Sequence, residues 1–280
     1  MPEIKQKVHR PFTVTAITLL VWLLTAANCT RRESISLDVD FSTRPQWQYE
    51  AGIRISGTIE SRDSLQVYSG SAGCVLTGSQ RDEHADQLNI TASKIKIKAD
   101  FLDSTEVEHL TRQLQNARLY FALRAGTIAT PDSTELPVLM IGEWDFYRSF
   151  SKVVPTLPGG KVRIGSKWDR EKPIPLKTRH GDAVGHLYQT YVLDTIFTKD
   201  KIEFAVINWD FVYKIEPTQT DSLDLIRRLP LSGKGSGRAT INVTGNYLLD
   251  AQVLFEVVPQ VDSPVKAGWK ELVQIRLKDY

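Results

Sequence analysis

The chain has 280 residues, of which 41% are hydrophobic and 24% are charged, and its formal net charge is +2. This length suffices for one large β-domain or two small domains. Because the chain has almost no basic surplus, it lacks an electrostatic basis for binding nucleic acid, and we exclude nucleic acid as a partner.

The first 28 residues have the layout of a secretory signal peptide. A basic start is followed by the uncharged segment Phe12–Ala27 and by small residues that lead into Cys29. In bacteria, a cysteine in this position can receive a lipid and become the mature N-terminus. We therefore predict a signal peptide over 1–28, a lipidated Cys29 and a short tether over 29–34.

Two alternatives to lipidation stay open. An ordinary signal peptide cut after Ala27 would leave Cys29 free, and an uncleaved segment would anchor the chain as a membrane helix. Ala26 and Asn28 depart from the usual lipobox residues. The apolar stretch, however, is shorter than the ~20 residues that span a bilayer, and two arginines follow it, whereas basic residues prefer the cytoplasmic flank.

The mature chain carries no net charge. Removing residues 1–28 takes away three basic residues and one acidic residue, which leaves 32 of each. We expect the membrane to be a partner through the lipid on Cys29. Thr30, which follows it, is not acidic, so the predicted location is the outer membrane, facing the periplasm. The second cysteine, Cys74, lies among small and apolar residues and is predicted to be a buried thiol.

The N-terminal half predicts antiparallel strands, because apolar and polar residues alternate. The alternating segments are Ile35–Phe41, Trp47–Ile59, Leu65–Thr77 and Leu88–Phe101. The phase slips in the last of these, which predicts a β-bulge near Ala92–Lys94.

Two helices are expected next. Thr105 and Glu108 have the spacing of a capping box before an amphipathic helix. After a strand over Leu119–Leu123, the apolar segment Pro137–Lys152 predicts a second helix, packed between layers. The run Pro155–Gly160 then breaks the chain.

The C-terminal half returns to strands. Leu187–Phe197 and Ile202–Tyr213 carry apolar residues on both faces, which predicts central strands covered on both sides. Three alternate glycines, Gly233, Gly235 and Gly237, precede a predicted hairpin. Such glycines leave one strand face bare, so that a helix or a tryptophan can pack closely.

These elements predict an α+β fold that is mainly antiparallel β. We expect a curved meander sheet, half-open and barrel-like, with one or two helices packed on it. Residues 35–280 are predicted to form a single β-rich domain, and a division into two lobes near 155–160 is the alternative.

Several segments together resemble a family of uncharacterised bacterial exported lipoproteins that carries a domain-of-unknown-function label. They are Pro155–Pro158, Val162–Trp168, Tyr188–Leu193, the Gly233 to Gly237 strand and the turn at Gly245. The resemblance follows the order of elements over about residues 35 to 277. It implies export and a strand-rich fold, and it offers no catalytic residues.

Candidate chemistry is sparse. His180, Asp182 and His186 are residue types that bind zinc, but their spacing matches no metal motif, so we predict no metal, no cofactor and no catalytic residues. For a ligand, the best candidates are the aromatic residues Trp47, Trp168, Trp209 and Tyr213, although large aromatic residues more often belong to the core.

Three functions remain open on this basis. The first is a non-enzymatic envelope lipoprotein that binds an apolar ligand or an envelope protein. The second is an exported enzyme, a hydrolase or a metal-dependent one, with a site near His180, Asp182 and His186. The third is a structural surface protein without a ligand cleft.

Lipidation is testable by changing Cys29→Ala. Because stable anchoring takes more than one acyl chain, the fully modified wild type should stay with the membrane fraction, and the variant should be released. Fractionation and mass spectrometry of the mature N-terminus measure this. A variant that stays membrane-bound, or a wild type without lipid on Cys29, contradicts the prediction.

Overall fold

The computed structural model describes residues 34–39, 47–60, 63–82, 85–116, 118–124, 127–128, 140–141, 144–145, 149, 152–178, 181–217, 232–258 and 266–278. The chain divides into two compact units, Met1–Ser34 and Ile35–Tyr280, and every element below belongs to the second. The predicted signal peptide and Cys29 lie outside the described residues.

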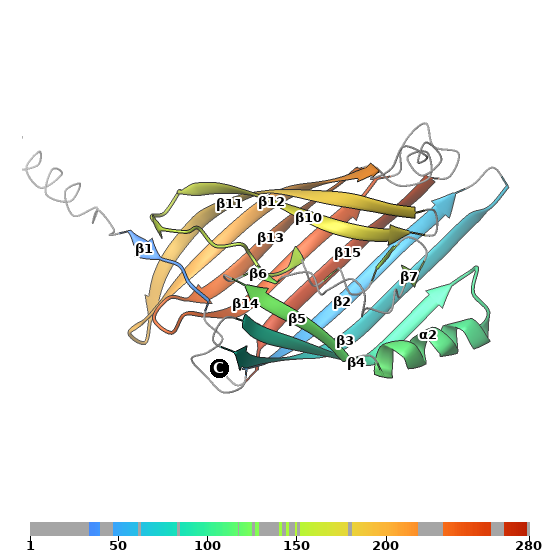
Figure 1. Cartoon of the computed structure of the whole chain (residues 1–280), viewed down its shortest axis with the longest axis horizontal. Helices are drawn as coiled ribbons and strands as arrows, with labels where there is room; N and C mark the ends of the chain where they lie inside the picture. Colours follow the sequence, from blue (N-terminus) through green and yellow to red (C-terminus); the bar gives the residue numbers. More distant parts are fainter. Residues whose placement is uncertain are drawn as a thin grey trace, which may run out of the picture. The chain divides into compact units, whose positions relative to one another are not determined.

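One antiparallel sheet of eleven strands makes up most of this unit, in the order β10-β11-β12-β13-β14-β15-β2-β3-β4-β5-β6 (Figure 1). Its strands are β2 (Trp47–Glu60), β3 (Leu65–Asp82), β4 (Ala85–Ala99), β5 (Arg118–Arg124), β6 (Thr127–Ile128), β10 (Lys167–Thr178), β11 (Gly181–Lys199), β12 (Ile202–Pro217), β13 (Ser232–Asn242), β14 (Tyr247–Val257) and β15 (Lys266–Leu277).

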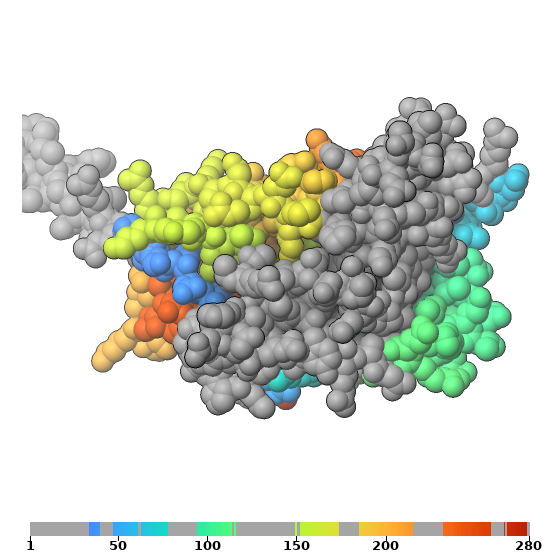
Figure 2. Space-filling view, in the orientation of Figure 1, coloured from blue at the N-terminus to red at the C-terminus, as the bar shows by residue number. Residues whose placement is uncertain are grey.

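Smaller elements accompany the sheet. Helix α2 (Ser104–Asn116) packs against β4, and two short pairs join β1 (Ile35–Ser36) to β9 (Lys161–Val162) and β7 (Met140–Ile141) to β8 (Trp144–Asp145). In Figure 2 the blue segment that contains β1 lies against the yellow-green segment that contains β9.

The predicted fold class is confirmed: the sheet is a curved antiparallel meander with a helix packed on it. Strands β2 to β6 form one run and β10 to β15 another, and the pairing of β15 with β2 joins the two runs. The edges of the described sheet are β10 and β6. Pro173 and Pro175 fit β10 because an edge strand needs no N–H donor on its free side.

Backbone geometry confirms the predicted bulge and defines one hairpin turn. The pairing of β3 with β4 shifts between Ser71 and Gly73, and Lys94 on the opposite strand has φ 51°, so the bulge lies close to the predicted place. At the β11–β12 turn, Asp200 and Lys201 have φ of 52° and 67°. Positive φ at both central residues is typical of the type I′ turn, whose twist matches the strands that it joins.

The capping box of α2 lies two residues before the predicted one. The Glu106 N–H donates to Asp103 Oδ1 at 2.8 Å, and the Asp103 N–H donates to Glu106 Oε2 at 2.9 Å. Thr105 and Glu108 lie inside the helix instead. Asp103 is the N-cap residue instead of Thr105 because its carboxylate accepts a charge-assisted hydrogen bond at the positive end of the helix.

The predicted second helix over Pro137–Lys152 is wrong at Met140–Ile141 and Trp144–Asp145, which are strands, whereas Ser149 is helical. Met140 pairs with Asp145 and Ile141 with Trp144, in a tight antiparallel hairpin. Between the paired strands the sequence is Gly142-Glu143, and a two-residue connection that starts with Gly is typical of hairpins. Apolar content alone therefore did not distinguish this strand pair from a helix.

A row of residues, all buried except the half-buried Gly237, crosses the sheet on one face, which we call the inner face. In pairing order it is Trp168, Tyr191, Trp209, Gly237, Val253, Val273 and Ile53. At Gly237 an added Cβ would lie 2.1 Å from the Trp209 ring, and at Gly235 it would lie 2.2 Å from the Phe211 ring. The prediction that these glycines admit a closely packed tryptophan is confirmed.

Burial of β11 and β12 on both faces is confirmed only in part. Phe204 to Ile207 are buried on both sides of β12. Farther along, Val212 of β12 is 44% exposed and Tyr188 of β11 is 38% exposed, and both lie on the opposite face, the outer face. Strand β11 also pairs directly with the edge strand β10, so it is not a central strand. The outer face therefore keeps apolar side chains in contact with water.

Replacing Gly237→Val tests the contact between the glycine and the tryptophan. A side chain there overlaps the Trp209 ring, so we expect a loss of about 1–3 kcal/mol or more in unfolding free energy. The matched control is Gly52→Val on β2, where an added Cβ meets nothing within 4 Å. Urea unfolding of both variants measures the difference, and equal losses would show that the packing of Gly237 is unimportant.

Candidate functional site

The four aromatic residues predicted to line a ligand are all buried: Trp47, Trp168, Trp209 and Tyr213. Trp168 stacks on Tyr191 with ring centroids 5.5 Å apart, and Tyr191 lies 5.6 Å from Trp209. Tyr213 meets Phe255 edge-on, while Trp47 packs on Tyr247 at a distance in the sheet. The fold thus places these residues in the core, and only Trp209 also borders a groove.

A short segment crosses the inner face and is held by polar contacts. Residues 152–158, which we call the strap, include the buried Val153 and Val154. The Thr156 N–H donates to the Tyr191 hydroxyl at 3.1 Å, and Trp168 Nε1 donates to the Thr156 carbonyl at 2.8 Å. Tyr191 and Trp168 of the inner face therefore hold the strap in place as well as filling the core.

The strap also carries a buried ion pair. Lys152 Nζ lies 2.9 Å from Glu271 Oε2 and 4.3 Å from the centre of the Phe255 ring. Glu271 is only 1% exposed, and its Oε1 has no hydrogen-bond partner. A pair this deep carries a large desolvation cost, so its main effect is to specify where the strap sits.

The residues considered for a metal are not assembled in the described part of the chain. His186 Nδ1 lies 2.8 Å from Glu171 Oε1 on the outer face. Asp182 is four residues before His186 on β11, which corresponds to about 13 Å along a strand. His180 lies outside the described residues. No group of three His, Cys, Asp or Glu within the described ranges is placed to hold a metal ion.

Cys74 is a buried free thiol, as predicted. Burial raises the pKa of this thiol to about 12. Since the thiolate is the reactive form, the side chain is inert at neutral pH and acts as a small apolar core residue.

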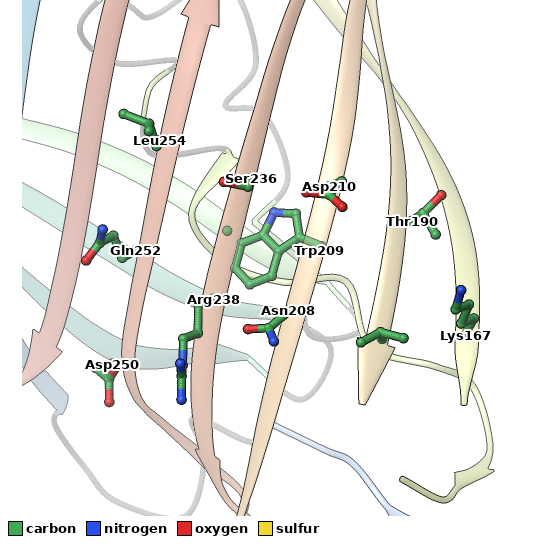
Figure 3. Close-up of a pocket in the computed structure, with 12 residues that line it drawn as sticks. Lys167, Thr190, Asn208, Trp209, Asp210, Ser236, Arg238, Asp250, Gln252 and Leu254 are labelled. Atoms are coloured by element: carbon green, nitrogen blue, oxygen red, sulfur yellow. The ribbon is translucent and has the colours of Figure 1, made fainter. Parts of the chain in front are cut away.

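A groove runs along β13 on the outer face, and we call it the β13 groove (Figure 3). It consists of two adjoining hollows of about 620 and 560 Å³ that share Thr190, Asp210, Ser236 and Leu254. These residues come from β11, β12, β13 and β14, so the walls are strands of the rigid sheet.

The short side chain of Ser236 on β13 produces the groove. Ser236 lies between Asp210 of β12 and Leu254 of β14, both of which are longer. On the opposite face of β13 the glycines carry no side chain, and the Trp209 ring packs against Gly237. Strand β13 is therefore thin at Ser236 and Gly237, whereas Lys234 and Arg238 on its outer face are long and exposed.

One end of the groove carries three exposed apolar side chains. Leu254 on β14 is 50% exposed, Val212 and Tyr188 lie across β13 from it on β12 and β11, and Lys234 and Glu256 line the same hollow. Lys214 Nζ lies 5.7 Å from the centre of the Tyr188 ring. Exposed apolar side chains grouped around a hollow mark a binding surface more often than single ones do.

The other end is polar. Arg238 lies directly opposite Asn208 on β12 and Gln252 on β14, and Asp250 and Lys167 complete this end. Figure 3 shows Arg238 between Asn208 and Asp250. The groove thus joins an apolar wall to a charged one.

Sequence reasoning missed the groove, although its signal was present. The apolar residues on the second face of β11 and β12 were interpreted as covered, whereas part of that face is open. Only the pairing with β13, which places the short Ser236 between β12 and β14, shows why those side chains border a hollow.

No family model and no curated protein matches the chain. Among solved structures, lipovitellin, in a study of its lipid–protein interactions, is similar at 12% identity with a TM-score of 0.45. The match covers 85% of this chain and 25% of lipovitellin, so the chain spans about a quarter of that protein.

Two other solved structures match at 7% identity. The COG4313 outer membrane channel from Pseudomonas putida F1 has a TM-score of 0.21, with 89% of this chain and 98% of that chain covered. A DUF1329 family protein from Desulfovibrio piger has a TM-score of 0.12, with 85% and 86% covered. These scores assign no activity and no ligand, so the resemblance to an exported lipoprotein family stays a prediction.

Within the part of the chain that the structure describes, no helix has the length and apolar character needed to cross a bilayer.

The buried ion pair gives a testable prediction. Changing Lys152→Met leaves the Glu271 carboxylate buried without its partner, and we expect a loss of about 3–5 kcal/mol in unfolding free energy. The double variant Lys152→Met with Glu271→Leu should regain much of this loss. Urea unfolding measures both.

The control is the exposed pair of Lys270 and Glu256, whose atoms are 3.1 Å apart. Because water screens it, Lys270→Gln should cost about 1 kcal/mol or less. If Lys152→Met costs no more than this control, the buried pair does not hold the strap.

Proposed function

We propose that the protein is an exported, lipid-anchored protein of the bacterial envelope that binds the apolar chain of an amphiphilic ligand in the β13 groove and catalyses no reaction. The single observation behind this proposal is the group of exposed apolar side chains, Tyr188, Val212 and Leu254, around the trough at Ser236. The lipid on Cys29 would place the groove near a membrane that supplies such ligands.

The groove suits an extended hydrocarbon chain. Its floor is Ser236, and the side chains of Lys234 and Arg238 border it at either end, about 13 Å apart for four residue steps along β13. Each methylene removed from water contributes up to about 0.8 kcal/mol, and less in a groove that is open on one side. The walls are built on paired strands, so little ordering of the protein is needed on binding.

The groove's charged residues favour binding over catalysis. Among the described residues, Arg238, Asp210 and Lys167 form no ion pair with one another, and none is hydrogen-bonded to a nucleophile. Catalytic groups usually occur as a nucleophile or acid within hydrogen-bond reach of a base. The pair of His186 and Glu171 lies outside the residues that line the groove.

The test measures the binding of dodecyl maltoside, whose head is uncharged, to the mature protein. The ligand is titrated below its micelle concentration, and NMR chemical shifts report binding. Ser236→Leu should fill the trough, and Leu254→Asp should place a charge against the chain. We expect each variant to weaken binding at least tenfold.

Leu65→Asp is the matched control, because Leu65 is 63% exposed on β3 and does not line the groove. Thermal unfolding confirms that each variant is folded. Absence of binding by the wild type, or an equal loss in Leu65→Asp, contradicts the proposed function.

A further inference from the structure

The polar end of the β13 groove has one cation surrounded by four polar neighbours. Arg238 lies directly opposite Asn208 and Gln252 in the pairing register. Asp210 and Asp250 occupy the diagonal positions on the same two strands, on the same face. Diagonal neighbours across a sheet are about 7 Å apart, so a small head group on Arg238 also reaches one of these two carboxylates.

These charges are not neutralised by each other. Within the described residues, no ion pair joins Arg238 to Asp210 or to Asp250. Two further cations lie nearby, Lys167 at the rim and Arg276 opposite Asp250 on β15. The head-group end therefore offers both signs of charge at short range, in a nearly balanced mixture.

We infer that the groove takes a single-chain amphiphile with a zwitterionic phosphate–ammonium head, an inference that rests on the proposed function. The guanidinium of Arg238 binds the phosphate, because its fork matches two phosphate oxygens. Asn208 and Gln252 supply neutral amide donors on either side. Asp210 and Asp250 lie on opposite sides of Arg238 along the strands, and either carboxylate can meet the ammonium.

The choice of a zwitterionic head group rests on charge complementarity. A purely anionic head would meet two carboxylates, and a purely cationic head would meet Arg238. A zwitterionic head pairs with both signs, and like-charge contacts are what discriminate against the other heads. The apolar chain then lies toward Leu254 and Val212, on the same strands.

The experiment compares four dodecyl ligands that differ only in the head: phosphocholine, phosphate, trimethylammonium and the uncharged maltoside. All are titrated below their micelle concentrations into the mature protein. We expect the wild type to bind the phosphocholine at least fivefold more tightly than each of the other three.

Two variants should shift this preference in opposite directions. Arg238→Gln should abolish the advantage of phosphocholine and favour trimethylammonium. The double variant Asp210→Asn with Asp250→Asn should favour dodecyl phosphate. Lys98→Gln, an exposed residue on β4 away from the groove, is the control and should leave the order unchanged.

The outcomes separate the two proposals. If all four ligands bind within about twofold of one another, the chain-binding function stands and the zwitterionic head group is wrong. If Arg238→Gln changes all four affinities equally, the head-group assignment is also wrong. If none of the four binds the wild type, the proposed function fails with it.

Discussion

The packing of aromatic rings on the bare face of β13 is the contact on which the rest of the sheet depends. Gly233, Gly235 and Gly237 let the rings of neighbouring strands approach the backbone to distances that no Cβ would allow. A strand without side chains on one face also bends easily. Because Ser236 is small on the other face, the same strand leaves the groove outside.

The pairing of β15 with β2 turns two meanders into one sheet. It brings together segments from opposite ends of the unit, with Trp269 opposite Gly57 and Val273 opposite Ile53. Pairings this distant in sequence are slow to form and gain nothing until the intervening loop is closed. The buried pair of Lys152 and Glu271 then attaches the strap to the β15 side of this junction.

The amphipathic character of the groove comes from incomplete cover of the outer face. Phe204 to Ile207 are covered on both sides, whereas Val212, on the same strand, is open to water. Apolar side chains next to a trough favour a hydrocarbon chain, and the row that contains Arg238 adds charge one step along the strands. The proposed ligand site thus lies on the part of the outer face where apolar side chains are exposed.

The sequence by itself determined the strands, the bulge near Lys94, the close packing at Gly237 and the burial of Cys74, because period two, phase slips and glycine spacing are local signals. It misjudged Met140–Ile141 and Trp144–Asp145 as helix, since apolar content alone does not separate a strand pair from a helix. It also placed Trp47 and Trp168 as ligand candidates, although a tryptophan looks the same in sequence whether it lines a core or a ligand site. Which face of β11 and β12 stays open was decided only by the tertiary structure, because cover depends on segments that are distant in sequence.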